Sequence, residues 1–349
     1  MNFRSALLAV LALLLAACSP STTVQFTPTP AVEETTGLSG PLVIYSARSE
    51  PLIQPVLDAF QAQYPEVEIR IKSGNNSELA NALLEERNNP QADVFITTEL
   101  LTVQSLNQEG VFQSYRSPAA AALPEGFTGP NDSWTGLTRR ARVIMYNTDL
   151  VPEGEAPTSI FDLTDPKWRG QIAAAGSANG SMQAQIAAMR QLVGEGVTEA
   201  WLRDLLANEV TFFGGHTDVR KAVGAGEFKI GLVNHYYYHL QKEEGSPVGI
   251  VYPDQGEGQI GLITNATAIA IVQGAKNPAA AQALVDFLLT PEGQEIFARL
   301  NFEYPLVEGV ALQPDVAPLD EFRLADVDIA AAALDLDETF DLMERVNLP

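Results

Sequence analysis

The chain has 349 residues, with 21 Lys and Arg against 44 Asp and Glu, which gives a formal charge of −23. Such an acidic surface repels phosphate backbones, so nucleic acid is excluded as a partner. Hydrophobic residues make up 46% of the chain, too many for a disordered acidic protein, and the length suggests about two domains. The single cysteine, Cys18, excludes an intrachain disulfide and a thiolate metal cluster.

The first residues are typical of a secretory signal. Arg4 is followed by a continuous apolar run and then by Leu15-Ala16-Ala17-Cys18, which resembles the lipobox of bacterial lipoproteins. We therefore predict a signal peptide over residues 1–17 and lipidation of Cys18, with a tether rich in Thr, Pro and Ser over residues 18–39. No later stretch is apolar for long enough to span a bilayer. The expected location is the outer face of the cytoplasmic membrane or the periplasm, with a lipid anchor.

From Pro41 onward, short β-rich runs alternate with amphipathic helical runs. The predicted strands cover residues 42–45, 67–71, 93–97, 142–147, 171–175, 210–213, 230–233 and 266–272. The predicted helices cover residues 50–64, 77–86 and 100–110, the runs after Gly180 and His216, and residues 278–289, 291–300 and 338–346. This alternation favours a parallel, doubly wound α/β sheet.

A segment rich in Ala, Pro and Gly, residues 118–140, separates two such α/β units. The apolar run 266–272 has no third unit to join, so we expect the chain to return to the first unit after about residue 261. The predicted N-lobe comprises residues 40–139 and about 262–315. The predicted C-lobe comprises residues 140–261 and about 316–349. Neither a P-loop nor a GxGxxG fingerprint follows a strand, so nucleotide binding is not supported.

A run of three tyrosines, Tyr236, Tyr237 and Tyr238, directly follows an apolar strand. In a doubly wound domain, the carboxyl end of a strand opens onto the ligand crevice. Phenolate oxygen is a hard ligand suited to a hard trivalent cation such as ferric iron. A free tyrosine has a pKa near 10, so only a strong Lewis acid deprotonates several of them near neutral pH. The alternative is an aromatic core cluster with its hydroxyls at the surface.

Two histidines, His235 and His239, flank this run at a helical spacing that can bind zinc. A metal-dependent hydrolase is therefore an alternative of another class. However, no HExxH motif surrounds the pair, no third histidine lies nearby, and no GxSxG elbow is present. We predict that the chain is not an enzyme.

Three further segments could bind an anion. Arg48 and Ser49 stand between a predicted strand and the helix after it, and Asn179 and Ser181 stand at the start of another helix. Helix N-termini favour negative groups. A cluster of three arginines around Arg140 leads into the strand that carries Tyr146. A local arginine cluster in an acidic chain indicates an anionic or carboxylate partner.

The chain resembles the ferric-ion-binding substrate proteins of bacterial iron ABC importers, within family 1 of the extracellular solute-binding proteins. The resemblance covers nearly the whole chain after the tether. It rests on segments in the family's order and spacing: LVIYSARSE, ADVFITTE, RARVIMYNTDL, DLTDPKWRGQI, SANGSMQAQ, LVNHYYY and TPEGQEIFARLNFEYPL. It implies a type II periplasmic-binding-protein fold, in which two doubly wound lobes are joined by a hinge and hold the ligand cleft between them.

The resemblance also implies a ligand set. Tyr236 and Tyr237 would supply phenolates, with Tyr146 as a third ligand and Tyr238 as packing. Some members add a histidine and a glutamate, but those places here hold Ser49 and Thr98, with Glu99 one residue late. This favours a tyrosine-dominated site completed by an anion such as carbonate. The residues expected to anchor that anion are Arg48, Ser49, Arg140, Asn179, Ser181, His216 and Asn234.

The function implied is the capture of Fe³⁺ and its delivery to an ABC permease and its ATPase by a monomeric lipoprotein. The same fold could instead bind a small organic anion or oxyanion, with the arginines as its partners and the tyrosines as aromatic walls.

Overall fold

The structure, a computed structural model, describes residues 37–349. The predicted signal peptide, Cys18 and most of the predicted tether lie outside the described residues. Within residues 37–349, no helix combines the length and the apolar character that crossing a membrane requires.

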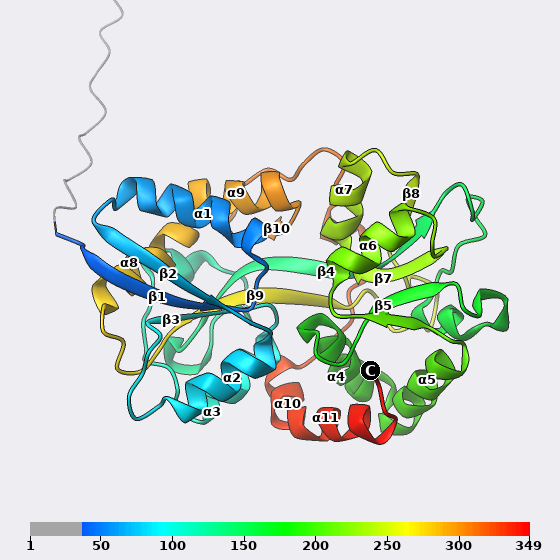
Figure 1. The fold of residues 1–349 in the computed structure, drawn as a ribbon, viewed down its shortest axis with the longest axis horizontal. Helices are drawn as coiled ribbons and strands as arrows, with labels where there is room; N and C mark the ends of the chain where they lie inside the picture. The colour runs from blue at the N-terminus through cyan, green and yellow to red at the C-terminus, as the bar shows by residue number, and fades with distance from the viewer. Residues whose placement is uncertain (1–36) are drawn as a thin grey trace, which may run out of the picture. The chain divides into compact units, whose positions relative to one another are not determined.

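Ten strands form one mixed sheet, with a central order of β2-β1-β3-β9-β4-β7-β5-β6 (Figure 1). The strands are β1 (Gly40–Ser46), β2 (Val67–Ser73), β3 (Val94–Thr97), β4 (Thr135–Asn147), β5 (Ile172–Ala175), β6 (Thr211–Phe213), β7 (Ile230–Asn234), β8 (Val248–Val251), β9 (Thr264–Ile271) and β10 (Tyr304–Pro305). Strands β8 and β10 pair with β4 outside this order. The predicted strands are all present, and β8 and β10 are additional.

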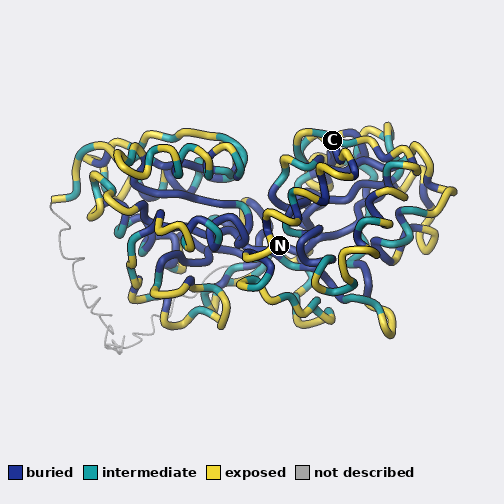
Figure 2. Tube along the Cα trace, turned by 90° about the horizontal axis from the view of Figure 1, so that it is seen from below, coloured by how far each residue is buried: buried dark blue, intermediate teal, exposed yellow. Residues whose placement is uncertain are grey.

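Eleven α-helices accompany the sheet in the described part of the chain. They are α1 (Glu50–Gln63), α2 (Asn76–Glu85), α3 (Leu100–Gln108), α4 (Gly180–Val193), α5 (Glu195–Ala207), α6 (His216–Gly224), α7 (His235–Glu243), α8 (Pro278–Leu288), α9 (Pro291–Asn301), α10 (Ile329–Leu334) and α11 (Leu336–Arg345). Figure 2 shows that the strands are largely buried, whereas many helices expose an outer face.

The prediction of a parallel sheet is correct only for part of the sheet. Strand β1 runs parallel to β2 and β3, and β5 runs parallel to β6 and β7. Strand β4, by contrast, is antiparallel to β9 over Thr135–Ala141 and to β7 over Arg142–Tyr146. The long strand β4 therefore joins the two parallel groups, and Figure 1 shows β4 and β9 running from one group toward the other. The segment expected to separate the units thus ends inside a continuous strand.

Apolar side chains form a core around each group of strands. One core joins Leu42 and Ile53 to Leu284 and Phe297, so α8 and α9 pack beside β1 and α1. Another joins residues of β5, α4 and α5, with Trp201 among its buried members. Of the C-terminal helices, α10 packs on α3 and also contacts α4, while α11 packs on α4.

Candidate ligand-binding site

A cavity of about 290 Å³ lies where both groups of strands end. This volume is at the lower limit of ordinary small-molecule sites, so the cavity suits an ion with a small companion. The N-terminal ends of five helices, α1, α2, α4, α6 and α7, contribute residues to its lining. Because helix N-termini carry unsatisfied N–H groups and partial positive charge, their convergence favours a negatively charged ligand.

Two tyrosines at the start of α7, Tyr236 and Tyr237, line this cavity. Their rings lie with centroids 4.2 Å apart. Burial raises the pKa of Tyr237 well above its ordinary value, the neighbouring Tyr236 raises it further, and Arg48 and Arg140 oppose the rise. The free protein therefore holds Tyr237 as a neutral phenol at neutral pH, and a bound cation would have to displace its proton.

Arg140 lines the same cavity and forms no ion pair within residues 37–349, although its charge helps to lower the pKa of the buried Glu99 and Glu303. Its side chain is 1% exposed, and its Nε and Nη2 atoms have no hydrogen-bond partner among residues 37–349. A buried guanidinium without a partner is costly, so a bound anion would satisfy it. Its position agrees with the anion-anchoring role predicted for it.

Arg48 also lines the cavity, but a carboxylate already neutralises it. Its guanidinium forms an ion pair with the buried Glu303, whose Oε2 accepts from Nη1 at 3.0 Å, and Nη1 also donates to Thr267 Oγ1 at 2.8 Å. Burial alone would raise the pKa of Glu303, but the charge of Arg48 holds that pKa below its ordinary value. The expected anion-binding role of Arg48 thus meets a competing partner within the protein.

Arg142 lies behind the cavity lining and holds the side chains of Gln185 and Asn234 in place. Its Nε donates to Gln185 Oε1 at 2.9 Å, and its Nη1 donates to Asn234 Oδ1 at 3.1 Å. The Asn234 amide then donates to Ser181 Oγ at 3.0 Å. Asn234, predicted to touch the anion, therefore lies behind the lining and positions Ser181, which does line the cavity.

His216, at the first turn of α6, lines the cavity and lies 3.1 Å from Arg142 Nη1 through its Nε2. Since a guanidinium only donates, Nε2 accepts and the proton is assigned to Nδ1. That Nδ1 has no partner within the described chain. Burial lowers the pKa of His216 well below its ordinary value, and Arg142 and Arg140 lower it further. His216 thus offers a neutral N–H donor suited to an anion.

The two remaining predicted anion residues line the cavity from helix starts. Asn179 caps α4 by accepting from the Ser181 backbone N–H at 3.0 Å. Ser49 precedes α1, and its side chain makes no capping hydrogen bond to that helix.

The structure does not bring Tyr146 to this cavity. In the β4–β7 register, Arg142 stands opposite Asn234 and Tyr146 opposite Ile230. Tyr146 therefore lies four residues, about 14 Å, farther from the end of β7 that leads to the tyrosine pair. Its ring packs in the core and fills the space above Gly249. The third tyrosine ligand implied by the resemblance is thus not assembled with the other two.

Three residues that the resemblance leaves outside the ligand set are also placed. Thr98 lines the cavity. Glu99 is buried and caps α3, accepting from the backbone N–H of Thr102 at 2.9 Å, so its carboxylate is turned to the helix. Tyr238 packs in the apolar cluster that also contains Val248, outside the cavity lining.

The alternative zinc site at His235 and His239 is not supported. Both ring nitrogens of His235 are engaged by the backbone: Nδ1 accepts from Ala141 N–H at 3.2 Å, and Nε2 lies 2.8 Å from the Phe302 carbonyl. The His239 ring stacks on Phe302 with centroids 5.1 Å apart. Across the described chain, no group of three or more His, Cys, Asp or Glu side chains is arranged to hold a metal ion.

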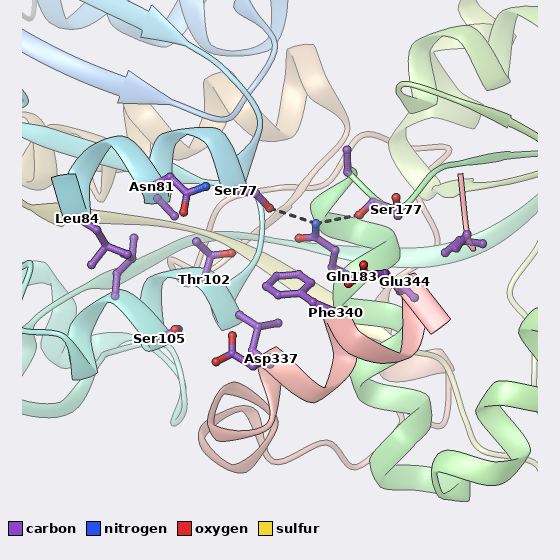
Figure 3. A pocket seen from close by; sticks show the side chains of 16 residues that line it. Ser77, Asn81, Leu84, Thr102, Ser105, Ser177, Gln183, Asp337, Phe340 and Glu344 are labelled. Atoms are coloured by element: carbon purple, nitrogen blue, oxygen red, sulfur yellow. Dashed lines mark hydrogen bonds between the residues drawn. The ribbon is translucent and has the colours of Figure 1, made fainter. Parts of the chain in front are cut away.

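A larger cavity, of about 620 Å³, lies beside α2, α3, α4 and α11 (Figure 3). Its lining combines hydroxyls and amides such as Ser77 and Gln183 with apolar side chains such as Phe340. Among the described residues, its lining contains neither arginine nor tyrosine, and Asp337 and Glu344 are the charged side chains in it. The chemistry for a metal ion and an anion is therefore in the smaller cavity.

Sequence reasoning missed the contribution of Asn75 and Asn76, which line the cavity at the start of α2. The signal was present, because Asn75 is an N-cap that accepts from Glu78 N–H at 2.9 Å, and Asn-rich turns before helices are recognisable. The pairing of Arg48 with Glu303 had no local signal.

A family model described as bacterial extracellular solute-binding protein matches residues 89–332. Iron uptake protein A1 of Synechocystis is 30% identical over 89% of this chain and 86% of that protein. The structure of iron-bound HitA from Pseudomonas aeruginosa is 28% identical, with a TM-score of 0.81, over 88% of this chain and 99% of that one. A Trichodesmium protein (IdiA, FutA) in complex with iron and citrate ligands is 28% identical, with a TM-score of 0.71, over 89% of this chain and all of that one.

Proposed function

Because the chain belongs to the family of bacterial extracellular solute-binding proteins, we propose that it captures ferric iron in the smaller cavity and delivers it to an ABC permease. Its α/β fold is that of the periplasmic binding proteins, as predicted. Membership of this family is a binding role, not an enzymatic one. The similarity to iron-uptake and iron-bound proteins over most of the chain supports the choice of iron.

The observation that carries the proposal is the meeting of Tyr236 and Tyr237 with the unpartnered Arg140 in one cavity. Phenolates suit ferric iron, and the guanidinium suits an anion bound beside it. A pocket whose tyrosines served only as an apolar wall would not explain the buried charge of Arg140.

Charge balance indicates that the iron binds with a companion anion. A ferric ion with two phenolates keeps one positive charge, and Arg140 and Arg142 add two more, of which the buried Glu99 near Arg140 offsets at most one. No carboxylate forms an ion pair with either arginine among the described residues. A multiply charged anion, carbonate or a carboxylate, would therefore stabilise the loaded site, with Ser181 and the His216 Nδ1–H as further donors. The Trichodesmium relative was solved with iron and citrate.

We place this binding step in an exported, monomeric lipoprotein, held by Cys18 and the tether 18–39 and serving a permease with its ATPase. The lobes assigned from the sequence would close by a hinge in β4 and β9, and the closed form would be what the permease recognises.

The test is the phenolate-to-iron charge-transfer band. Adding ferric nitrilotriacetate to iron-free protein should produce a visible band. The variants Tyr236→Phe and Tyr237→Phe should each shift or abolish it and weaken iron binding by more than the roughly 10–100-fold that loss of an outer-sphere partner costs. Tyr238→Phe is the matched control, because this neighbour lies outside the cavity lining and should leave the band unchanged.

A colourless mixture with wild-type protein would overturn the proposal. Calorimetry with citrate or phosphate in the absence of metal addresses the second candidate, a carrier of small anions, which the unpartnered Arg140 favours. Tight anion binding without iron, combined with no colour, would establish that candidate instead.

A further inference from the structure

A glycine in the lining of the ligand cavity lies at a close contact between the two groups of strands and helices. Gly180 is the first residue of α4, and it lies directly against Asn76, the first residue of α2. A Cβ built at Gly180 would overlap Asn76 Nδ2, and it would come within 3.0 Å of Thr98 Oγ1 and 3.1 Å of Glu99 Cγ. Only a residue without a side chain fits there.

The atoms that exclude a side chain at position 180 belong to residues across the cavity and not to α4 itself. Gly180 does not adopt a left-handed backbone conformation, and the first turn of a helix accepts alanine readily. An alanine would therefore be unstrained in its own helix. It would meet resistance only when α4 approaches α2 and the start of α3.

The residues facing Gly180 cannot easily move aside. Asn76 is 1% exposed, and its amide donates to Thr98 Oγ1 at 3.0 Å and to Glu99 Oε1 at 3.3 Å. Its Oδ1 accepts from Thr97 Oγ1 at 3.1 Å. Moving Asn76 would break hydrogen bonds in a buried network, so the contact is rigid on this side.

A second contact links the same two helices. Gln183, one turn into α4, donates to Ser77 Oγ at 3.4 Å and to the Ser177 carbonyl at 2.9 Å. Figure 3 shows both bonds as dashed lines between Ser77, Gln183 and Ser177. Helices α4 and α2 thus meet at one hydrogen bond, Gln183 to Ser77, and at one close steric contact, Gly180 against Asn76. The steric contact depends on the absence of a side chain at position 180.

We propose that Gly180 is the close-approach residue that allows α4 and α2 to shut over the ligand cavity, so that the side chain at this position sets ligand affinity and release through closure. The ligand-dependent part of this proposal rests on the proposed function, but the contact itself does not.

The test is a distance distribution between spin labels on Glu85→Cys of α2 and Ala200→Cys of α5, both exposed, in a chain with Cys18→Ser. The labelled protein that keeps Gly180 should show a population with a short distance between the two labels even without ligand. Ferric nitrilotriacetate should increase that population. Gly180→Ala should lose most of that population and release iron about tenfold faster or more, since overpacking a contact typically costs that much. Gly196→Ala is the matched control, because Gly196 also lies in the first turn of a helix but has open space around it.

Identical distributions for wild type and Gly180→Ala would overturn the proposal, as would the absence of a short distance in wild type. If iron shifts nothing while the ligand-free distributions differ, the proposed function fails and the closing contact stands. Adding Asn76→Ala to Gly180→Ala should restore the short distance, and no restoration would overturn the assignment of the clash to Asn76.

Discussion

Two buried arginines at the cavity differ in whether the protein supplies their counter-ion. Arg48 has Glu303, whereas Arg140 has no carboxylate within ion-pair distance among residues 37–349. Removing one partner of a buried ion pair destabilises the folded protein, because the other charge is left unpaired in a medium of low dielectric. An unpaired one is available to a ligand and costs stability until the ligand arrives.

The two arginines therefore predict opposite phenotypes. Arg48→Gln should lower the free energy of unfolding by about 3–5 kcal/mol, because Glu303 is left buried and charged. Arg140→Gln should leave the free energy of unfolding of the ligand-free protein unchanged or raise it slightly. It should weaken iron binding by about 1.5–3 kcal/mol through loss of a charge-assisted hydrogen bond. Urea unfolding and iron titration measure the two effects.

A larger loss of stability for Arg140→Gln than for Arg48→Gln would contradict this assignment. It would mean that Arg140 has a partner in the folded protein and that Arg48 faces the ligand.

At the residue scale, the sequence predicted the parts of the site that are local in the chain. Tyr236 and Tyr237 were visible because they directly follow a strand, and Asn179 because it begins a helix. The partner of Arg48 lies 255 residues away, and no periodicity carries such information. The sequence could therefore identify an arginine as a candidate anion-binding residue, but it could not show whether a carboxylate of the protein already pairs with that arginine.

At the scale of the element, strand β4 decides which tyrosines can act together. Its register places Arg142 beside Asn234 at the end of β7, and it carries Tyr146 away from that end. The sequence predicted a strand over 142–147, but the strand begins at Thr135 and changes partners at Arg142. Register depends on the pairing partner, which the sequence of one strand does not reveal.

Tyr146→Phe should accordingly leave the iron band and the affinity unchanged within about twofold, since the Tyr146 phenol lies on the far part of β4. The measurement is the same ferric titration, with Tyr237→Phe as the positive control in the same buffer.

Loss of the band in Tyr146→Phe would restore the three-tyrosine site that the resemblance implied. It would also require β4 to reach the cavity through a rearrangement that this structure does not contain.

At the scale of the whole molecule, alternation of strands and helices predicted the α/β class but not the direction of every strand. Strand β9 returns from the second group and runs antiparallel to both β3 and β4. An apolar run such as 266–272 is compatible with either direction, because strand orientation follows from where the chain re-enters the sheet. The very short β10 pairs with β4 outside the central order, and a two-residue strand has no readable pattern.

The three histidines of the chain give the whole molecule a predicted acid sensitivity. His216, His235 and His239 are all buried, and burial lowers the pKa of His235 to about 3 and that of His239 to about 4. Burial lowers the pKa of His216 well below its ordinary value. In the unfolded chain these rings have a pKa near 6.5, so the unfolded state binds more protons below that pH.

The stabilising contribution of the histidines is therefore complete above pH 6.5 and is lost as the pH falls toward 4. Each ring adds up to about 1.4 kcal/mol per pH unit to the slope, so three give up to about 4 kcal/mol per unit between pH 6 and 5. Urea unfolding at pH 7, 6 and 5 measures the slope. His239→Gln should remove about a third of this slope, because it removes one of the three rings. The replacement breaks no hydrogen bond at Nε2, since that atom has no partner within the described chain. A free energy of unfolding that stays level from pH 7 to 5 would show that the rings accept protons in the folded state, contrary to their burial.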